Sequence, residues 1–255
     1  MGRILAIGDI HGCAGMLDTL LAAVSPAPDD TLVTLGDYTD RGTDSRGVLD
    51  RLVALGQGLH LVALRGNHDQ MMLSARQDAQ VFAEWRGVGG DATLRSYGGR
   101  LDAVPPAHWH FLEAQCVDLW ECDTHFFVHG GVIPDLPLRD QPPYVLYWER
   151  FERPAPHGSG KIMVCGHTSQ KSGLPRNLGH AVCLDTYAYG GGWLTCLDIG
   201  SGQVWQADNG GHVRRFPIDE RLEGEKVCPH IASASDESPC GGLRCLQNAY
   251  LCQVC

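Results

Sequence analysis

The stretch TLVTLGDYTDR, residues 31–41, decides how the rest of the sequence is interpreted. It begins as an apolar run typical of a buried parallel strand, and it breaks at Gly36. Two carboxylates and a guanidinium then follow within five residues: Asp37, Asp40 and Arg41. Ligands of open α/β sheets bind at the carboxyl ends of strands, so we expect Asp37 at a metal or phosphate site with Arg41 close behind it.

The same pattern recurs four more times along the chain. Residues 3–12 (RILAIGDIHG) and 59–69 (LHLVALRGNHD) each carry a short apolar run into glycine and then into Asp or Asn followed by His. Residues 124–131 (THFFVHGG) and 161–168 (KIMVCGHT) carry apolar runs into histidine. Five predicted strands therefore end in side chains that bind metals: Asp9, His11, Asp37, Asn67, His129 and His167.

The ordered set GDIHG, GDYTDRG, LRGNHD, VHGG and CGHT resembles the signature of the calcineurin-like metallophosphoesterases. It is most similar to their phosphoprotein phosphatase branch, with its bacterial and phage Ser/Thr phosphatases and its symmetrical diadenosine tetraphosphatases. The likeness spans roughly residues 1–215. A single Asp or Asn after a strand is equally well explained as a helix cap, but that explanation does not suit five motifs in order.

The resemblance implies a centre of two divalent transition-metal ions. Carboxylate, amide and imidazole ligands favour Mn above all, with Fe or Zn as alternatives. By resemblance, one ion is held by Asp9, His11 and Asp37. The second is held by Asp37, Asn67, His129 and His167, so that the carboxylate of Asp37 bridges the two ions.

The resemblance also assigns four residues to the chemistry of phosphate ester cleavage. His68 resembles the general acid, and Asp40 the carboxylate that orients its imidazole. Arg41 resembles a clamp that binds phosphate through two parallel hydrogen bonds. Arg150, in the run YWERFER from residue 147, matches a second phosphate-binding arginine of phage-type members, and Arg153 competes for that assignment because it lies one helical turn away.

These roles predict a two-metal phosphoesterase that hydrolyses phosphomonoesters, with metal-activated hydroxide as the nucleophile and His68 as the acid. We expect a protein Ser/Thr phosphatase with some phosphotyrosine activity. Symmetrical hydrolysis of diadenosine tetraphosphate is the alternative, since the motifs bind only the phosphate that both substrates share. A non-catalytic metal-binding scaffold is a more remote alternative, because it has no need for His68, Asp40 and Arg41 together.

The sequence pattern predicts an α/β protein, and the resemblance implies a four-layer α/β/β/α sandwich of two mixed sheets flanked by helices. One helix is expected at residues 13–24. A second is expected to carry an apolar stripe from Val48 to Leu55, to be capped by Asp44 or Ser45, and to end before Gly56. Residues 70–120, which we call the cap, look helical and are expected to cover the site, with Trp85, Trp109 and Trp120 in its core. Short β-rich runs from residue 161 onward predict that the second sheet forms there.

The composition changes near residue 222, which predicts a catalytic domain at residues 1–221 and a Cys-rich appendage at 222–255. The C-x-x-C spacing of Cys252 and Cys255 leaves a zinc site open. A short amphipathic helix docked on the body is the favoured interpretation, because four apolar residues recur at helical spacing: Leu243, Leu246, Tyr250 and Val254.

The bulk composition is that of an ordinary globular protein, with 255 residues, 44% hydrophobic and 20% charged. The formal net charge of −10 argues against broad nucleic-acid binding. No apolar run is long enough for a signal sequence or a membrane span, and an odd count of eleven cysteines is typical of reduced thiols. We therefore expect a cytoplasmic protein whose partner is a phosphorylated protein or a small phosphoester, without membrane contact. The sequence does not indicate the oligomeric state.

Overall fold

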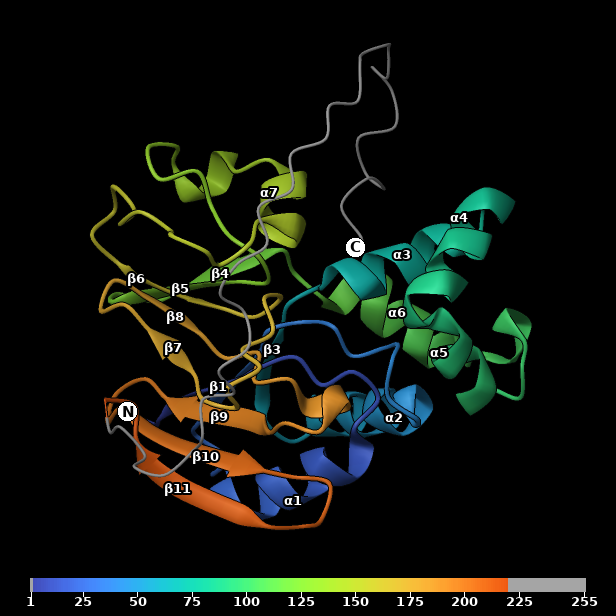
Figure 1. Ribbon diagram of the computed structural model, residues 1–255, viewed down its shortest axis with the longest axis horizontal. Coiled ribbons are helices and arrows are strands. Elements are labelled where there is room, and N and C mark those ends of the chain that lie inside the picture. Colours follow the sequence, from blue (N-terminus) through green and yellow to red (C-terminus); the bar gives the residue numbers. More distant parts are fainter. Residues whose placement is uncertain (1, 220–255) are drawn as a thin grey trace, which may run out of the picture. The chain divides into compact units, whose positions relative to one another are not determined.

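The computed structural model describes residues 2–219, which form two mixed β-sheets with flanking helices (Figure 1). The predicted sandwich class is confirmed. The strand order is β11-β10-β9-β1-β2-β3 in the first sheet and β4-β5-β6-β8-β7 in the second. The predicted appendage at 222–255, with its zinc-site and docked-helix alternatives, lies outside the described residues.

The first sheet is parallel at one side and antiparallel at the other. Its parallel strands are β1 (Ile4–Ile7), β2 (Thr31–Thr34) and β3 (His60–Ala63). These three strands are adjacent, so their carboxyl ends lie along one sheet edge. The antiparallel strands are β9 (Leu194–Asp198), β10 (Gln203–Ala207) and β11 (Val213–Pro217).

The second sheet begins earlier in the chain than the sequence pattern predicts. Its strands are β4 (Leu119–Glu121), β5 (His125–Val128), β6 (Ile162–Cys165), β7 (Arg176–Asn177) and β8 (Ala181–Cys183). The prediction that all strands after residue 161 form this sheet is wrong for β9–β11, because β9 pairs with β1 and extends the first sheet. Alternating hydrophobicity marks a strand but does not say which free strand edge it joins.

Three helices flank the sheets: α1 (Ala14–Val24), α2 (Ser45–Leu55) and α7 (Pro143–Trp148). Helix α1 packs against β9, β10 and β11. Asp44 caps α2, since its carboxylate accepts a hydrogen bond from the Gly47 amide at 2.8 Å. Within residues 2–219, no helix combines the length and the apolar character that a membrane crossing requires.

The cap is helical, as predicted, and its helices gather on one side of the sheets (Figure 1). It contains α3 (Asn67–Ala75), α4 (Ala79–Trp85), a π-helical segment (Arg86–Gly90), α5 (Asp91–Ser96), α6 (Pro106–His110) and a second π-helical segment (Phe111–Gln115). Trp85 and Trp109 are buried in it. Trp120 is not part of the cap core, because it lies on β4 of the second sheet.

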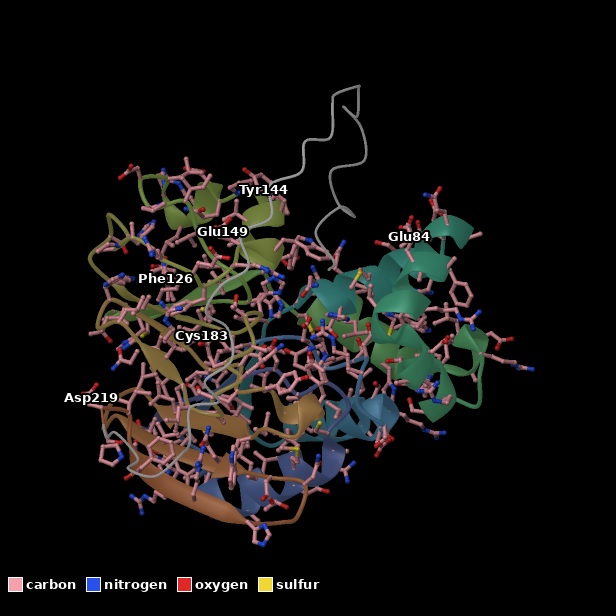
Figure 2. The ribbon with its side chains drawn as sticks, in the orientation of Figure 1. Glu84, Phe126, Tyr144, Glu149, Cys183 and Asp219 are labelled. Carbon is pink, nitrogen blue, oxygen red and sulfur yellow. The ribbon has the colours of Figure 1, made fainter. Side chains whose placement is uncertain are left out.

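Two apolar clusters hold these layers together. The larger joins the first sheet, α1, α2 and the cap, and the smaller includes Phe126 and Cys183 inside the second sheet (Figure 2). Strands β1, β5 and β6 are buried at three of their four positions, which means that both of their faces are covered. The rigid strands therefore fix the positions of the loops that follow them.

Candidate metal centre

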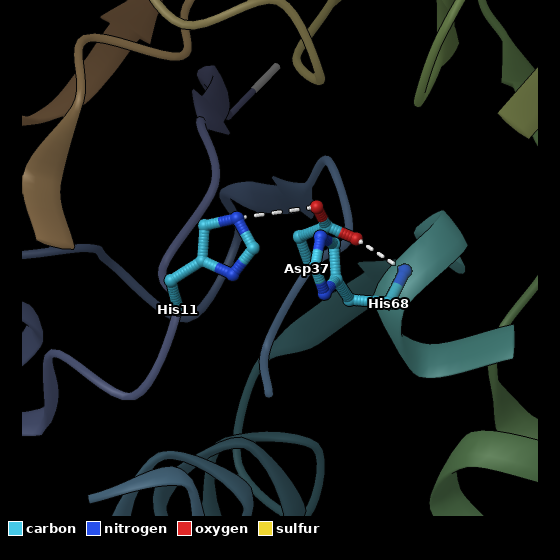
Figure 3. Close-up of side chains that lie close together, drawn as sticks. All are labelled: His11, Asp37 and His68. Carbon is cyan, nitrogen blue, oxygen red and sulfur yellow. Dashed lines mark hydrogen bonds and ion pairs between the residues drawn. The ribbon is translucent and has the colours of Figure 1, made fainter. Parts of the chain in front are cut away.

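The six predicted metal ligands come together at the carboxyl ends of five strands. Each follows β1, β2, β3, β5 or β6 directly: Asp9, His11, Asp37, Asn67, His129 and His167. All but His167 are fully buried. Donor atoms gather within 4.8 Å in two groups, one of His11, Asp37 and His68 and the other of Asp9, Asp37 and His129. Asp37 is the one member common to both groups, and it lies between His11 and His68 in Figure 3.

The shortest side-chain distances in the cluster run through Asp37 and Asn67. The Nε2 atom of His11 lies 3.2 Å from Oδ2 of Asp37, and Nε2 of His129 lies 3.5 Å from Oδ1 of the same carboxylate. The Oδ1 atom of Asn67 lies 2.9 Å from Nε2 of His129 and 3.1 Å from Nδ1 of His167. Asp9 is joined to the cluster through the backbone, because its carboxylate accepts from the His167 amide at 3.0 and 3.2 Å.

The tautomers of these histidines fit a bound cation. The Nδ1 atom of His11 lies 2.8 Å from the carbonyl oxygen of Thr39, and Nδ1 of His129 lies 2.8 Å from that of Leu35. A carbonyl oxygen only accepts, so each Nδ1 carries a proton and the Nε2 atom of each ring is turned toward Asp37. Positive charge between Nε2 and the carboxylate stabilises this arrangement: burial opposes the charged form of His11, but the Asp37 carboxylate outweighs it and raises the pKa of His11. The donor set therefore fits the metal pair that the sequence predicts.

Burial and neighbouring charges shift the pKa values of these groups in different directions. Burial lowers the pKa of His129, and burial together with nearby His129 lowers that of His167 to about 3, so both imidazoles stay neutral. Burial disfavours the charged form of Asp37, but the surrounding imidazoles outweigh it and lower its pKa. Burial and the neighbouring carboxylates of Asp185 and Asp37 raise the pKa of Asp9. Several acids crowded in one buried site are held most favourably by added positive charge.

Backbone strain is concentrated in the same loops. Of the seven non-glycine residues with positive φ in residues 2–219, five belong to the predicted site: His11, Asp37, Asp40, Arg41 and His167. Such conformations cost energy and persist only where surrounding contacts enforce them. Gly166 shows how close the chains come, because a Cβ at that position would lie 1.9 Å from Oδ1 of Asp9. Only glycine fits between β6 and this carboxylate.

His68 and Asp40 form a buried pair beside the ligand cluster. The Nδ1 atom of His68 lies 2.8 Å from Oδ2 of Asp40. Two residues of the cap also donate to Asp40: the indole of Trp85 at 2.8 and 3.0 Å, and the hydroxyl of Thr93 at 2.7 Å. Trp85 was predicted as a core residue of the cap, and no role at the site was predicted for Thr93. The signal in the sequence is the Gly-rich run RGVGG, residues 86–90, which separates the two.

Asp69 is another buried carboxylate near the cluster, and no role was predicted for it from the sequence. It accepts hydrogen bonds from the amides of Tyr38 and Thr39 at 3.1 and 3.3 Å and from the Gly66 amide at 3.0 Å. Burial, reinforced by the charge of Asp37, raises its pKa to about 7. Asp69 therefore holds the loop after β2 against the start of α3. In the sequence, Asp69 is the last residue of the motif LRGNHD and directly follows His68.

Arg41 lies at the mouth of the cluster. Its guanidinium Nη1 is 3.2 Å from Nε2 of His11, and its Cζ lies 4.7 Å from the ring centre of Tyr189. The ring of Tyr189 also meets that of His11 edge-on at 4.9 Å. No role for Tyr189 was predicted from the sequence. Its partly buried ring limits the directions that the Arg41 side chain can take.

The structure gives less support to a role for Arg150 at the site than to one for Arg41. Its side chain is exposed, and within residues 2–219 it makes no hydrogen bond or ion pair. Helix α7 ends at Trp148, so Arg150 and Arg153 do not share a helix and the argument from helical spacing fails. The backbone nevertheless passes near the cluster, because the amide of Phe151 donates to the hydroxyl of Thr168 at 2.8 Å, next to His167.

The sequence model of the family described as calcineurin-like phosphoesterase matches residues 2–197. Over 129 residues the chain is 38% identical to a protein named symmetrical bis(5'-nucleosyl)-tetraphosphatase from Ralstonia nicotianae, covering 51% of this chain and 42% of that protein. Over 90 residues it is 44% identical to serine/threonine-protein phosphatase 1 of Salmonella typhimurium, covering 35% and 39%. In both cases the matched part is less than half of the relative's length.

Two solved structures share the fold. A putative diadenosine tetraphosphatase superposes with a TM-score of 0.59 at 24% identity, covering 85% of this chain and 93% of that one. A cold-active protein-tyrosine phosphatase from a Shewanella species superposes with a TM-score of 0.61 at 19% identity, covering 84% and 80%. At these identities the likeness concerns the fold alone.

Proposed function

The chain belongs to the calcineurin-like phosphoesterase family, and we propose that it hydrolyses phosphomonoesters, with phosphorylated serine and threonine of proteins as its main substrates. We assign the activity to residues 1–221. The observation that supports this most strongly is the position of the buried His68–Asp40 pair against a cluster of metal ligands that share Asp37. A protein that only binds metal has no need for an oriented acid at this point.

We assign one metal to Asp9, His11 and Asp37 and the other to Asp37, Asn67, His129 and His167. Such a pair of divalent ions, when bound, supplies an activated water and neutralises charge on the phosphate. Asp37 suits the shared position because its two oxygens face different histidines, His11 at 3.2 Å and His129 at 3.5 Å. The mixture of nitrogen and oxygen ligands favours Mn, with Fe or Zn as alternatives.

The remaining residues bind the ester and deliver a proton. Arg41 offers a planar guanidinium at the mouth of the cluster, and we assign it to the phosphate oxygens. His68 holds its Nδ1 proton against Asp40, which leaves Nε2 to donate a proton to the departing alkoxide oxygen. The Asp40 carboxylate faces the His68 ring at 2.8 Å and stabilises positive charge on that ring before the transfer. His68 stands near enough for this role, since one of its ring nitrogens lies within 4.8 Å of donor atoms of both His11 and Asp37.

Symmetrical hydrolysis of diadenosine tetraphosphate is the second candidate, and the Ralstonia relative with that name supports it. The residues assigned above contact only the phosphoryl group, and both kinds of substrate contain one. A direct comparison of kcat/KM on a phosphoserine peptide and on diadenosine tetraphosphate, with Mn as the added metal, separates the two. We expect the peptide to be preferred. A preference of 100-fold or more for the dinucleotide would replace our proposal by the second candidate.

A further inference from the structure

We propose that Trp85 is a positioning residue for the proton donor His68 and that it acts through Asp40. This inference rests on the proposed function, because it takes His68 as the general acid. Trp85 belongs to helix α4 of the cap, and it is 0% exposed. Such a tryptophan is ordinarily a core residue, so its hydrogen bond must be weighed against simple packing.

The contacts of Asp40 show what the indole adds. The Nε1 atom of Trp85 lies 2.8 Å from Oδ2 and 3.0 Å from Oδ1, so one N–H group straddles both carboxylate oxygens. The hydroxyl of Thr93 donates to Oδ1 at 2.7 Å, and His68 contacts Oδ2 at 2.8 Å. Every donor is buried. Asp40 is thereby fixed in rotation and satisfied as an anion, which holds the proton of His68 on Nδ1 and aims Nε2 at the reaction.

The backbone of the cap is shaped to bring this indole to Asp40. The π-helical segment Arg86–Gly90 follows Trp85 and is kinked at Gly89, whose φ is +131°. The carbonyl of Gly89 accepts a hydrogen bond from the Arg41 amide at 3.2 Å. A Cβ at Gly90 would lie 2.4 Å from the Trp85 ring.

A second buried tryptophan in the cap provides the comparison. Trp109 lies on α6, is 9% exposed, and stacks under the guanidinium of Arg76 at 4.2 Å. Its ring makes no hydrogen bond in the described part of the chain. If Trp85 served only to fill the cap, Trp85→Phe and Trp109→Phe would have the same kind of effect. If it positions the acid, only Trp85→Phe changes the chemistry.

The leaving group provides the test, carried out on the full-length, Mn-loaded protein. A phosphoserine peptide releases an alkoxide and needs a proton, whereas p-nitrophenyl phosphate releases a stable phenolate and needs it far less. We expect Trp85→Phe to lower kcat on the phosphopeptide by at least about 10-fold and kcat on p-nitrophenyl phosphate by less than about 3-fold. Trp109→Phe should lower both rates equally or not at all. Thr93→Val should show the same selective loss of kcat on the phosphopeptide, and Thr93→Ser should have nearly the wild-type kcat. These two variants still test the positioning of Asp40 if Trp85→Phe does not fold.

A spectroscopic measurement tests the contact without any turnover. In the ¹H–¹⁵N spectrum, the indole N–H signal that disappears in Trp85→Phe should lie downfield of the other indole signals and move upfield in Asp40→Asn. A signal at an ordinary shift that ignores Asp40→Asn would overturn the inference. If the wild-type protein is active but Trp85→Phe lowers kcat equally on both substrates, the inference is also overturned, and the proposed function still stands. A wild-type protein inactive on both substrates would instead refute the proposed function, and the inference would fall with it.

Discussion

The Nδ1 atom of His68 lies 2.8 Å from Oδ2 of Asp40, although the two residues follow different strands. Asp40 lies in the loop after β2, and His68 is the second residue of α3, the helix that follows β3. The two strands are adjacent and parallel, which brings both loops to the same edge of the first sheet. Because the pair is buried, the carboxylate acts on the imidazole with little screening by water.

Replacement of His68 by Asn should lower kcat on a phosphoserine peptide by about 100-fold or more. Asparagine cannot donate the proton, but the amide of residue 68, which donates to Oδ1 of Asp37 at 3.0 Å, is retained. Metal content measured by mass spectrometry should therefore stay at two equivalents. An unchanged kcat would remove His68 from the mechanism.

Metal content should respond differently to ligands that serve one ion and to the ligand that serves both. His167→Ala should lose one of two equivalents, because we assign its ring, whose Nδ1 lies 3.1 Å from Oδ1 of Asn67, to the second ion alone. Asp37→Ala should lose both, since its oxygens face His11 and His129. His110→Ala is the control, because this cap histidine is exposed and should leave two equivalents bound. Retention of one full equivalent by Asp37→Ala would argue against a shared carboxylate.

The positions of the proposed metal ligands could be predicted from the sequence because they depend on one rule: parallel strands end at a common edge. Each apolar run followed by Gly and a metal-binding side chain could be found independently of the others. The roles of Trp85 and Thr93 could not be predicted, because their partner Asp40 is 45 and 53 residues away and the kink at Gly89 sets the approach. Their hydrogen bonds depend on tertiary geometry that leaves no periodic trace in the chain.

The sequence also did not predict which strands belong to which of the two sheets, and the reason is again tertiary geometry. Strands β8 and β9 both look like short buried runs, yet β8 pairs with β6 in the second sheet and β9 with β1 in the first. Which sheet a strand joins depends on which sheet edge is unpaired where that strand lies, and this cannot be deduced from residue types alone. The same limit applies to Arg150, whose predicted role assumed a helix that ends at Trp148.

The pair formed by Asp30 and Arg3 should make stability depend on pH in the acid range. Asp30 is 3% exposed, and Arg3 contacts it through its amide at 2.7 Å and its guanidinium at 2.6 and 3.0 Å. Burial opposes the charged form, but hydrogen bonds from Arg3 and Ala27 outweigh it and lower the pKa of Asp30. The folded state therefore binds this proton less readily than the unfolded chain does. The resulting stabilisation is present at neutral pH and is lost as the pH falls below about 4.

Asp30→Asn should accordingly lower the free energy of unfolding by about 2 kcal/mol at pH 7. The difference from the wild-type protein should shrink below about pH 4, where the wild-type carboxyl also becomes neutral. Urea unfolding at several pH values measures both effects. Asp29→Asn, a change at the exposed neighbouring residue, is the matched control and should have little effect at any pH. A difference that stays constant down to pH 3 would contradict the assignment to Asp30.

Arg41 should matter more to phosphate binding than Arg150 does. Arg41 is half-buried and is ordered beside the cluster by contacts with His11 and Tyr189. Arg150 is exposed and would have to be ordered by the substrate, at a cost in side-chain entropy. We expect Arg41→Ala to lower kcat/KM by about 100-fold and to weaken inhibition by inorganic phosphate, with Arg41→Lys recovering little because an ammonium cannot make two parallel hydrogen bonds. Arg150→Ala should cost about 10-fold or less. Equal losses for the two alanine variants would show that substrate binding draws Arg150 into the site, and the exposed arginine would then share the phosphate with Arg41.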